Sequence, residues 1–161
     1  MEKMTEYKVM LLNPAEEKTA DLFEKILHGS DGTNGLTVAM NAYTTEMALM
    51  TNNPEELFKI YGNPVCVAFT EDYRVFGFIV VGADAGTKTV VTEHAYVRPE
   101  VRHKGIYKLM LKRVEKLVED IKFDRIVSFV FDENEDSQRV HEKEGFKHRM
   151  IGYMKEFKHE N

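Results

Sequence analysis

Residues 97–108, Val97-Arg98-Pro99-Glu100-Val101-Arg102-His103-Lys104-Gly105-Ile106-Tyr107-Lys108, decide how the rest of the chain is interpreted. A strand-forming stretch ends at Val97 and a helical period of apolar residues starts at Ile106, so the segment predicts a strand, a basic loop and a helix. The first turn of a helix attracts anions through its unpaired N–H groups and partial positive charge. Gly105 lets an anion approach the backbone closely. Three cationic side chains surround it: Arg102, Lys104 and Lys108. We therefore expect a phosphate or pyrophosphate cradle; the alternative is a basic turn without a ligand.

The segments on either side predict alternating strands and helices in a single layered α/β (α+β) domain. We expect strands over residues 6–12, 65–69, 75–81, 87–97, 126–131 and 147–157. Capping residues predict helices that start at Asn13 and Asn53, and one over 136–144 that ends at Gly145 with a contact from Phe146. The long helix after the loop has an apolar stripe of Ile106, Leu109, Met110, Val114, Leu117, Val118 and Ile121. Residues 30–51 carry no readable pattern.

Composition excludes several classes of protein. Of the 161 residues, 43% are hydrophobic and 30% charged, which is typical of a globular protein and not of a collagen-like or disordered one. The longest apolar run, residues 75–83, is too short to cross a bilayer, and residues 1–8 lack the apolar core of a signal peptide. The single cysteine, Cys66, excludes an internal disulfide, and we expect it in the core. The histidines lack the spacing of metal ligands, so we expect a cytoplasmic protein with no metal and no membrane partner.

Charge is distributed unevenly along the chain. Its net value of -5 argues against a nucleic-acid partner. Residues 1–97 hold 7 Lys and Arg against 14 Asp and Glu, whereas residues 98–161 hold 15 against 13. A short basic cluster in an acidic protein suits a compact anionic ligand better than a long polyanion.

Two motifs together resemble the GNAT N-acetyltransferase superfamily. The first, Val97-x-Pro99-Glu100-x-Arg102-x-Lys104-Gly105-Ile106 followed by Leu109-Met110-Leu111, is similar to the family's acyl-CoA-binding motif, Arg/Gln-x-x-Gly-x-Gly/Ala at a helix start. The second, Asn134, Ser137 and His141-Glu142-Lys143-x-Gly145-Phe146, resembles the family's Asn-x-x-Ala…Tyr-Glu-Lys-x-Gly-Phe run. The resemblance implies a mixed, largely antiparallel central sheet flanked by helices. Within a single domain over 1–161, residues 1–62 would form variable helices over the acceptor site, and 63–157 the acyl-CoA-binding core.

The resemblance also implies which residues bind acetyl-CoA. Backbone groups of Ala95, Tyr96 and Val97 would pair with the pantetheine arm, and Asn134 would meet that arm from a neighbouring strand's end. The pyrophosphate would be wrapped by the N–H groups of the loop and first helical turn. The full set is Ala95, Tyr96, Val97, Arg102, His103, Lys104, Gly105, Ile106, Tyr107, Lys108 and Asn134. Tyr107 departs from the family, which has Gly or Ala there, and it narrows the site.

Two residues are candidates for catalysis. Glu93 lies nine residues before Arg102, where many members of the family have a glutamate, and would act as general base. Strict alternation places it in an apolar row with Val91, Ala95 and Val97, where burial would make it a stronger base; a surface glutamate, or a bulge that turns it outward, is the alternative. His141 replaces the family's tyrosine, which often protonates the CoA thiolate, and an imidazole can do the same work. A histidine there equally fits lost catalysis with binding retained.

These features predict an enzyme that transfers an acetyl group from acetyl-CoA to a primary amine, on a small molecule or a protein, by direct attack. The acidic first half favours a cationic amine. The alternative, favoured by His141 and Tyr107, is a non-catalytic acyl-CoA-binding or protein-interaction module with a GNAT-like fold. Whether the chain forms a homodimer is left open.

Overall fold

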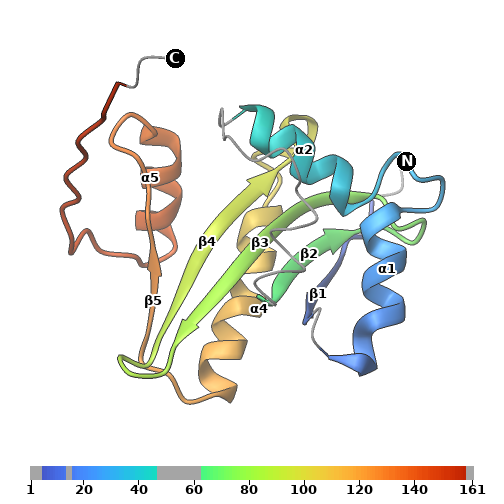
Figure 1. Cartoon of the computed structure of the whole chain (residues 1–161), viewed down its shortest axis with the longest axis horizontal. Coiled ribbons are helices and arrows are strands. Elements are labelled where there is room, and N and C mark those ends of the chain that lie inside the picture. The colour runs from blue at the N-terminus through green and yellow to red at the C-terminus, as the bar shows by residue number, and fades with distance from the viewer. Residues whose placement is uncertain (1–4, 14–15, 47–62, 159–161) are drawn as a thin grey trace. The chain divides into compact units, whose positions relative to one another are not determined.

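A five-stranded mixed sheet is the centre of the structure (Figure 1). The computed structural model describes residues 5–13, 16–46 and 63–158. The strands, in their order across the sheet, are β1 (Lys8–Leu12), β2 (Val65–Phe69), β3 (Val75–Asp84), β4 (Thr89–Val97) and β5 (Arg125–Ser128). The first four pair antiparallel, and β5 runs parallel to β4. The predicted mixed, largely antiparallel sheet is confirmed.

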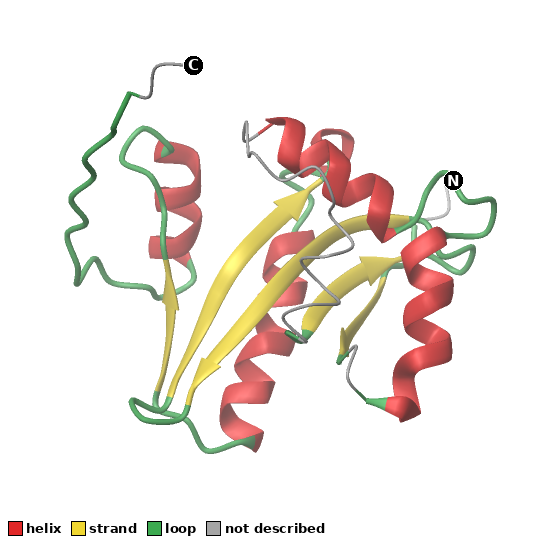
Figure 2. Ribbon diagram, viewed as in Figure 1, coloured by secondary structure: helices red, strands yellow, loops and turns green. Residues whose placement is uncertain are grey.

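Helices lie on both faces of this sheet (Figure 2). α1 (Ala20–His28) and α2 (Leu36–Glu46) pack on one face, and α4 (Ile106–Asp120) packs on the other. Short 3-10 turns, Glu17–Thr19 and Pro99–Val101, precede α1 and the loop before α4. The helix expected at Asn53 lies outside the described residues, whereas α2 lies in the segment that carried no readable pattern.

The chain forms two compact units, residues 1–129 and residues 130–161, and each is described by itself. The first contains the sheet with α1, α2 and α4. The second contains α5 (Glu135–Lys143) and the segment that follows it. That residues 1–161 act as a single domain stays a prediction.

The prediction of a last strand over residues 147–157 is wrong. No residue of this segment is assigned to a strand in the structure, and its apolar side chains, from Met150 to Phe157, are exposed. A strand needs a neighbour to pair its backbone N–H and C=O groups. The strand was predicted from the apolar residues of this segment alone, and that pattern carries no information on whether another strand lies beside it.

Two hydrophobic cores lie on opposite faces of the sheet. The α2-side core contains the buried side chains of Leu12, Phe23, Ile26, Leu27, Leu36, Met40, Tyr43, Phe78, Val80 and Tyr96, among others. The α4-side core contains Cys66, Ala68, Phe76, Ile79, Val81, Val90, Val101, Ile106, Met110 and Val114. Cys66 is fully buried, as expected, and burial raises the pKa of its thiol to about 12.

The apolar stripe of α4 is narrower than its sequence period predicts. Ile106, Met110 and Val114 are buried in the α4-side core, but Leu109 and Ile121 are 47% and 39% exposed. Spacing of four residues keeps the three buried side chains on one line, while Leu109 lies to the side of that line.

This difference within one helix predicts a difference in stability. Met110→Ala should lower the free energy of unfolding by about 2–5 kcal/mol, because it removes a fully buried side chain and leaves a cavity. Leu109→Ala, the neighbouring control, removes a similar volume from a half-exposed position and should cost about 1 kcal/mol or less. Urea unfolding followed by circular dichroism measures both. Equal losses for the two variants would contradict this arrangement of α4.

Candidate active site

β4 is paired with β5 over only its first four residues. The parallel ladder runs from Thr89 and Arg125 to Thr92 and Ser128, where it ends. At this last pair the two hydroxyl groups are hydrogen-bonded to each other. β5 ends at this pair, and residues 94–97 of β4 are paired in a ladder with β3 alone. Within the described chain, the other edge of this part of β4 carries no strand, which suits an extended ligand.

A β-bulge follows directly after that last pair. Val81 of β3 pairs with Thr92 and Val80 pairs with His94, so Glu93 is an extra residue between two consecutive pairs. An extra residue interrupts the alternation of side chains, because every later position is shifted by one.

The bulge turns two consecutive side chains toward the same face of the sheet. Glu93 lies against Gly82 of β3, and the ring of His94 contacts Tyr43 of α2. Gly82 lies two residues along β3 from Val80, whose side chain belongs to the α2-side core, so both contacts lie on that face.

The bulge corrects the predicted row of Val91, Glu93, Ala95 and Val97. After it, Tyr96 belongs to the α2-side core, whereas Val97 packs against the α4-side core. The side chain of Glu93 is exposed, so its expected burial among apolar neighbours is wrong. A bulge is present at Glu93, but it changes the faces of the residues after Glu93 and leaves Glu93 itself on the α2 side.

Glu93 is held in place by two neighbours. Nδ2 of Asn63 donates a hydrogen bond to its Oε2 over 2.6 Å. On the other side the carboxylate crosses Gly82 so closely that a Cβ at that position would collide with Oε1. A side chain at residue 82 would therefore displace the carboxylate.

His94 forms a second polar contact at the bulge that sequence reasoning missed. Its Nδ1 lies 2.9 Å from the hydroxyl of Tyr43, and the two rings meet edge to face. Burial lowers the pKa of His94, while the neighbouring Glu93 carboxylate acts in the opposite direction. Burial raises the pKa of Tyr43. The available signal in the sequence is the position of His94 beside Glu93, which becomes informative only once the bulge is known.

The loop between β4 and α4 is tied to the end of β4. Nε of Arg98 donates to the carbonyl of Val75, and Nε of Arg102 donates to the carbonyl of Val97, over 2.6 and 2.8 Å. The Arg102 guanidinium also lies over the ring of Tyr96, 5.5 Å from its centre. Arg102 thus fixes the strand end relative to the loop.

The start of α4 has the features expected of an anion cradle. His103 and Gly105 both have positive φ angles, 63° and 81°, which reverse the chain just ahead of the helix. Leu109 donates the first intrahelical bond to the Gly105 carbonyl, and no side chain caps the helix. A Cβ built on Gly105 would meet nothing within 4 Å, so the space over the backbone is open. Gly105 is therefore explained by its positive φ angle, which other residues rarely adopt, and not by a lack of space for a side chain.

The side chains around this loop leave the cradle accessible. Lys104 and Lys108 are exposed, while Ile106 is buried and anchors the helix start in the α4-side core. The ring of Tyr107 packs against the same core. A diphosphate therefore fits this loop: its backbone is open, cations flank it, and the tyrosine that departs from the family pattern is directed into the packing of α4.

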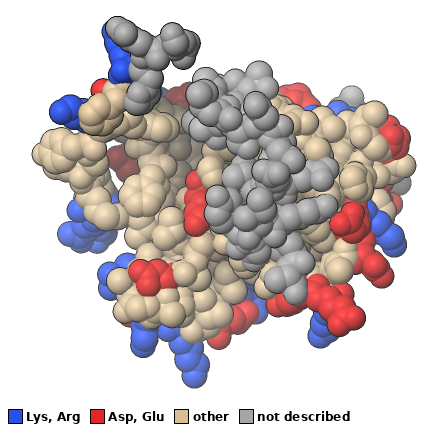
Figure 3. Space-filling view, in the orientation of Figure 1, with Lys and Arg blue, Asp and Glu red and all other residues tan. Residues whose placement is uncertain are grey.

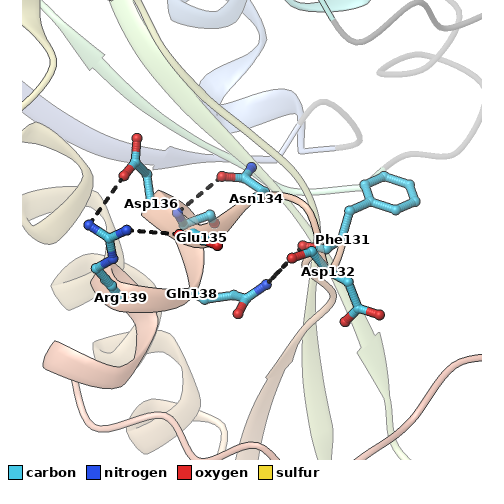
Figure 4. Close-up of polar contacts among 8 residues, drawn as sticks. Phe131, Asp132, Asn134, Glu135, Asp136, Gln138 and Arg139 are labelled. Atoms are coloured by element: carbon cyan, nitrogen blue, oxygen red, sulfur yellow. Dashed lines mark hydrogen bonds and ion pairs between the residues drawn. The ribbon is translucent and has the colours of Figure 1, made fainter.

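The second unit contains Asn134 as the N-cap of α5 (Figure 4). Its Oδ1 accepts a hydrogen bond from the backbone N–H of Ser137 over 3.1 Å. The Gln138 side chain donates to the carbonyls of Phe131 and Asp132, which ties the helix to the preceding turn. The cap engages Oδ1 and leaves the amide Nδ2 as the group of Asn134 suited to a ligand carbonyl.

His141 lies in the last turn of α5, in the second unit, whereas Glu93 lies in the first. Its Nδ1 lies 2.7 Å from the carbonyl of Ser137, and because a carbonyl only accepts, Nδ1 carries a proton. The ring packs edge to face on Phe146, and the Phe146 N–H bonds the His141 carbonyl after Gly145, whose φ is 91°. The predicted glycine cap with its Phe146 contact is confirmed.

Two features were not found among the described residues. Among them, no three His, Cys, Asp or Glu side chains lie close enough together to hold a metal ion. None of the helices in this part of the chain has both the length and the apolar character needed to span a bilayer.

Comparison with known proteins identifies the family. The sequence matches the model of the acetyltransferase (GNAT) family over residues 37–146, and no curated protein sequence matches it. Among solved structures, it is similar to the ribosomal-protein-alanine N-acetyltransferase of Brucella melitensis biovar Abortus, with a TM-score of 0.68, 16% identity, and coverage of 95% of this chain and 100% of that one. A GNAT-family acetyltransferase of Staphylococcus aureus has a TM-score of 0.61 and 15% identity, with 92% and 90% covered. The aminoglycoside N-acetyltransferase AAC(6')-Iy, in complex with CoA, has a TM-score of 0.55 and 19% identity, with 93% and 100% covered.

The family match covers both motifs, the bulged strand and the loop before α4, and the similar structures share the fold. The chain belongs to the GNAT family of acetyltransferases and is an acetyl-CoA-dependent N-acetyltransferase.

Proposed function

We propose that this N-acetyltransferase uses Glu93 to take a proton from a cationic primary amine and His141 to deliver a proton to the CoA thiolate. The observation that carries the proposal is the bulge in β4. At this bulge the Glu93 carboxylate is exposed on the α2 side, next to His94 and directly after the position in β4 where the ladder to β5 ends.

The environment of Glu93 suits a proton acceptor. The carboxylate is exposed to an arriving amine, and its direction is fixed by Asn63 on one side and Gly82 on the other. A base must lie within hydrogen-bond reach of the proton it takes, so a fixed carboxylate loses less entropy when the amine arrives.

The loop before α4 is suited to hold the diphosphate of CoA. The backbone N–H groups of Gly105 and Ile106 precede the hydrogen-bond ladder of α4, at its positive end. Lys104 and Lys108 add charge from exposed positions. The open edge of β4 at Ala95 and Val97 would receive the pantetheine arm, and Nδ2 of Asn134 would donate to it. When bound, acetyl-CoA supplies an acetyl thioester, an activated acyl group with a thiolate leaving group.

The hydrogen bond to Ser137 supports different roles for the two His141 nitrogens. Nδ1 keeps its proton on the carbonyl, so Nε2 is the nitrogen that would release a proton. A neutral imidazole in this tautomer has no proton on Nε2; the proposed acid is therefore the imidazolium form.

A cationic acceptor is supported by charge. The part of the chain before the loop is acidic, and Glu17, Asp21 and Glu24 are exposed along the start of α1 and the turn before it. On the face shown in Figure 3, acidic side chains gather toward the α1 side. The similar structures are named for a ribosomal-protein alanine and for aminoglycosides, so this fold serves protein and small-molecule amines. We propose an amine and not a nucleic acid as partner, and the cytoplasm as location, because a single buried cysteine needs no oxidising compartment.

Charge reversal at the loop tests the cofactor site. Lys104→Glu combined with Lys108→Glu should weaken CoA binding about tenfold at low salt, since each exposed cation contributes only about 0.2–1 kcal/mol. The difference should shrink as salt is raised. Isothermal titration with CoA measures it, with Lys112→Glu, one turn further along α4, as the control. An unchanged affinity in the double variant would place the diphosphate elsewhere.

Removing the charge of Glu93 tests the base. Glu93→Gln keeps the shape of the side chain and an acceptor for Asn63, so CoA affinity should stay the same while kcat falls about a hundredfold or more. Thiol release from acetyl-CoA is followed with a polyamine, an aminoglycoside and a lysine-containing peptide as acceptors. Glu71→Gln, on an exposed turn, is the matched control. A Glu93→Gln enzyme as fast as the wild type would refute this role.

A pair of substitutions that differ by one hydroxyl tests the acid. His141→Phe keeps an aromatic ring against Phe146 but cannot donate a proton, so kcat should fall at least tenfold while CoA binding is kept. His141→Tyr restores the residue typical of the family and should recover most of the rate. The same thiol-release assay compares the two, and equal rates for the Phe and Tyr variants would exclude residue 141 as the proton donor.

A further inference from the structure

The hydrogen-bonded pair of Tyr43 and His94 is a titratable group at the bulge that the proposed reaction leaves unused. It lies on the same face of the sheet as Glu93, because the bulge turns consecutive residues to one side. His94 is half-buried and Tyr43 is 7% exposed. A polar pair placed beside a candidate base, within a largely apolar core, calls for a chemical explanation.

The stoichiometry of acetylation supplies a chemical explanation for the Tyr43–His94 pair. A primary amine arrives as R–NH3⁺ and leaves as the amide R–NH–CO–CH3, so its nitrogen loses two protons while one N–C bond forms. The thioester C–S bond breaks and its electron pair goes to sulfur, which ends as a thiol after it gains one proton. One proton is therefore released overall. The acceptor side of the site must take two protons from one nitrogen, and a single carboxylate takes one at a time.

We propose that His94 is a second proton acceptor for the amine, oriented by Tyr43 and paired with Glu93. This inference rests on the proposed role of Glu93 and extends it: the carboxylate attracts the ammonium and takes one proton, and the imidazole takes the other.

The contact with Tyr43 engages Nδ1 of His94, so Nε2 is the nitrogen proposed to act on the amine. In the tautomer that serves the proposal, Nδ1–H donates to the Tyr43 oxygen and Nε2 carries the lone pair that accepts the proton. Tyr43 then plays the part of the third group in a nucleophile, base and orienter arrangement. It is itself held by aromatic contacts with Phe78 and Tyr96, whose ring centres lie 5.6 and 5.9 Å away.

The electrostatics of the pair support the same role. Burial lowers the pKa of His94, which keeps the imidazole neutral and able to accept a proton at neutral pH. Glu93 opposes this shift, because its carboxylate, while ionised, favours the imidazolium form of His94. Within the described residues, the titratable groups facing His94 are Glu93 on its own strand and Tyr43 on α2, while its β3 partner is the apolar Val80. Burial also raises the pKa of Tyr43, which therefore stays a neutral phenol.

The pH profile of the reaction tests the proposal. His94 loses its function when solvent protonates it, so kcat/KM for the amine should fall as the pH drops below 6.5, the ordinary pKa of a histidine. His94→Gln should abolish that acid limb and lower the plateau about a hundredfold, within the usual range for a general base. Glu93→Gln should lower the plateau but keep an acid limb, moved to lower pH by the loss of the neighbouring charge.

Thiol release is measured with whichever amine of the three-member panel the wild type acetylates fastest. His148→Gln, an exposed histidine on the segment after α5, is the control for the substitution itself. An acid limb and plateau that are the same in His94→Gln as in the wild type would overturn the proposal. If His94→Gln only damages the structure, the plateau of kcat/KM falls while the acid limb stays in place. That result would also overturn the proposal.

Two further arms keep the test decisive. Tyr43→Phe retains the ring packing and removes only the hydroxyl, so kcat should fall about fivefold with an unchanged KM for acetyl-CoA. An unchanged kcat would contradict the proposed role of the Tyr43–His94 pair, even where His94→Gln fails to fold.

If the wild type acetylates no amine of the panel, the proposed cationic acceptor is wrong. The pH profile of slow acetyl-CoA hydrolysis, with water in place of the amine, is then measured instead. Loss of its acid limb in His94→Gln supports the proposal, and its persistence overturns it.

Discussion

One unpaired residue in β4 determines how the two faces of the sheet are used. Side chains in a strand alternate with a period of two, so the extra residue at Glu93 exchanges the faces of every position after it. It occurs directly after Thr92, where the ladder to β5 ends. The open edge of β4 and the polar side chains of the bulge are therefore adjacent. A regular β4 would place Glu93 on the α2 side but turn His94 away from Tyr43.

The sheet separates the two halves of the proposed chemistry. On the α4 side, Val101 and Ile106 are buried on either side of the glycine loop and hold its backbone in the conformation that α4 requires. On the α2 side, Tyr43 holds His94 and Asn63 holds Glu93. Arg102 connects them, because it bonds the last carbonyl of β4 and covers the ring of Tyr96, which belongs to the α2-side core. Packing on both faces thus fixes the position of one strand end.

The sequence could predict what depends on local chemistry. The strand, basic loop and helix around Gly105, the cap of α5 at Gly145 and the burial of Cys66 each follow from a few neighbouring residues, and each is confirmed. What depends on a distant partner could not be read. The bulge is defined only by the pairing of β4 with β3, and α2 carries only a weak apolar period. Within the described residues, the segment after residue 146 is not paired in a sheet. The contact of His94 with Tyr43 could not be predicted either, since regular alternation directs His94 away from the face of Glu93.

The division of labour between Glu93 and His94 follows from their difference in burial. The exposed carboxylate of Glu93 carries the charge that attracts a cationic amine, whereas the half-buried imidazole of His94 is kept neutral by burial and has no charge with which to attract. The two groups together combine attraction with the capacity to take both protons. Two consecutive residues of a regular strand cannot share a face, and residues two apart are separated by about 7 Å. A bulge is the simplest change of backbone that places both groups beside one nitrogen, which gives the irregularity in β4 a chemical reason in the proposed reaction.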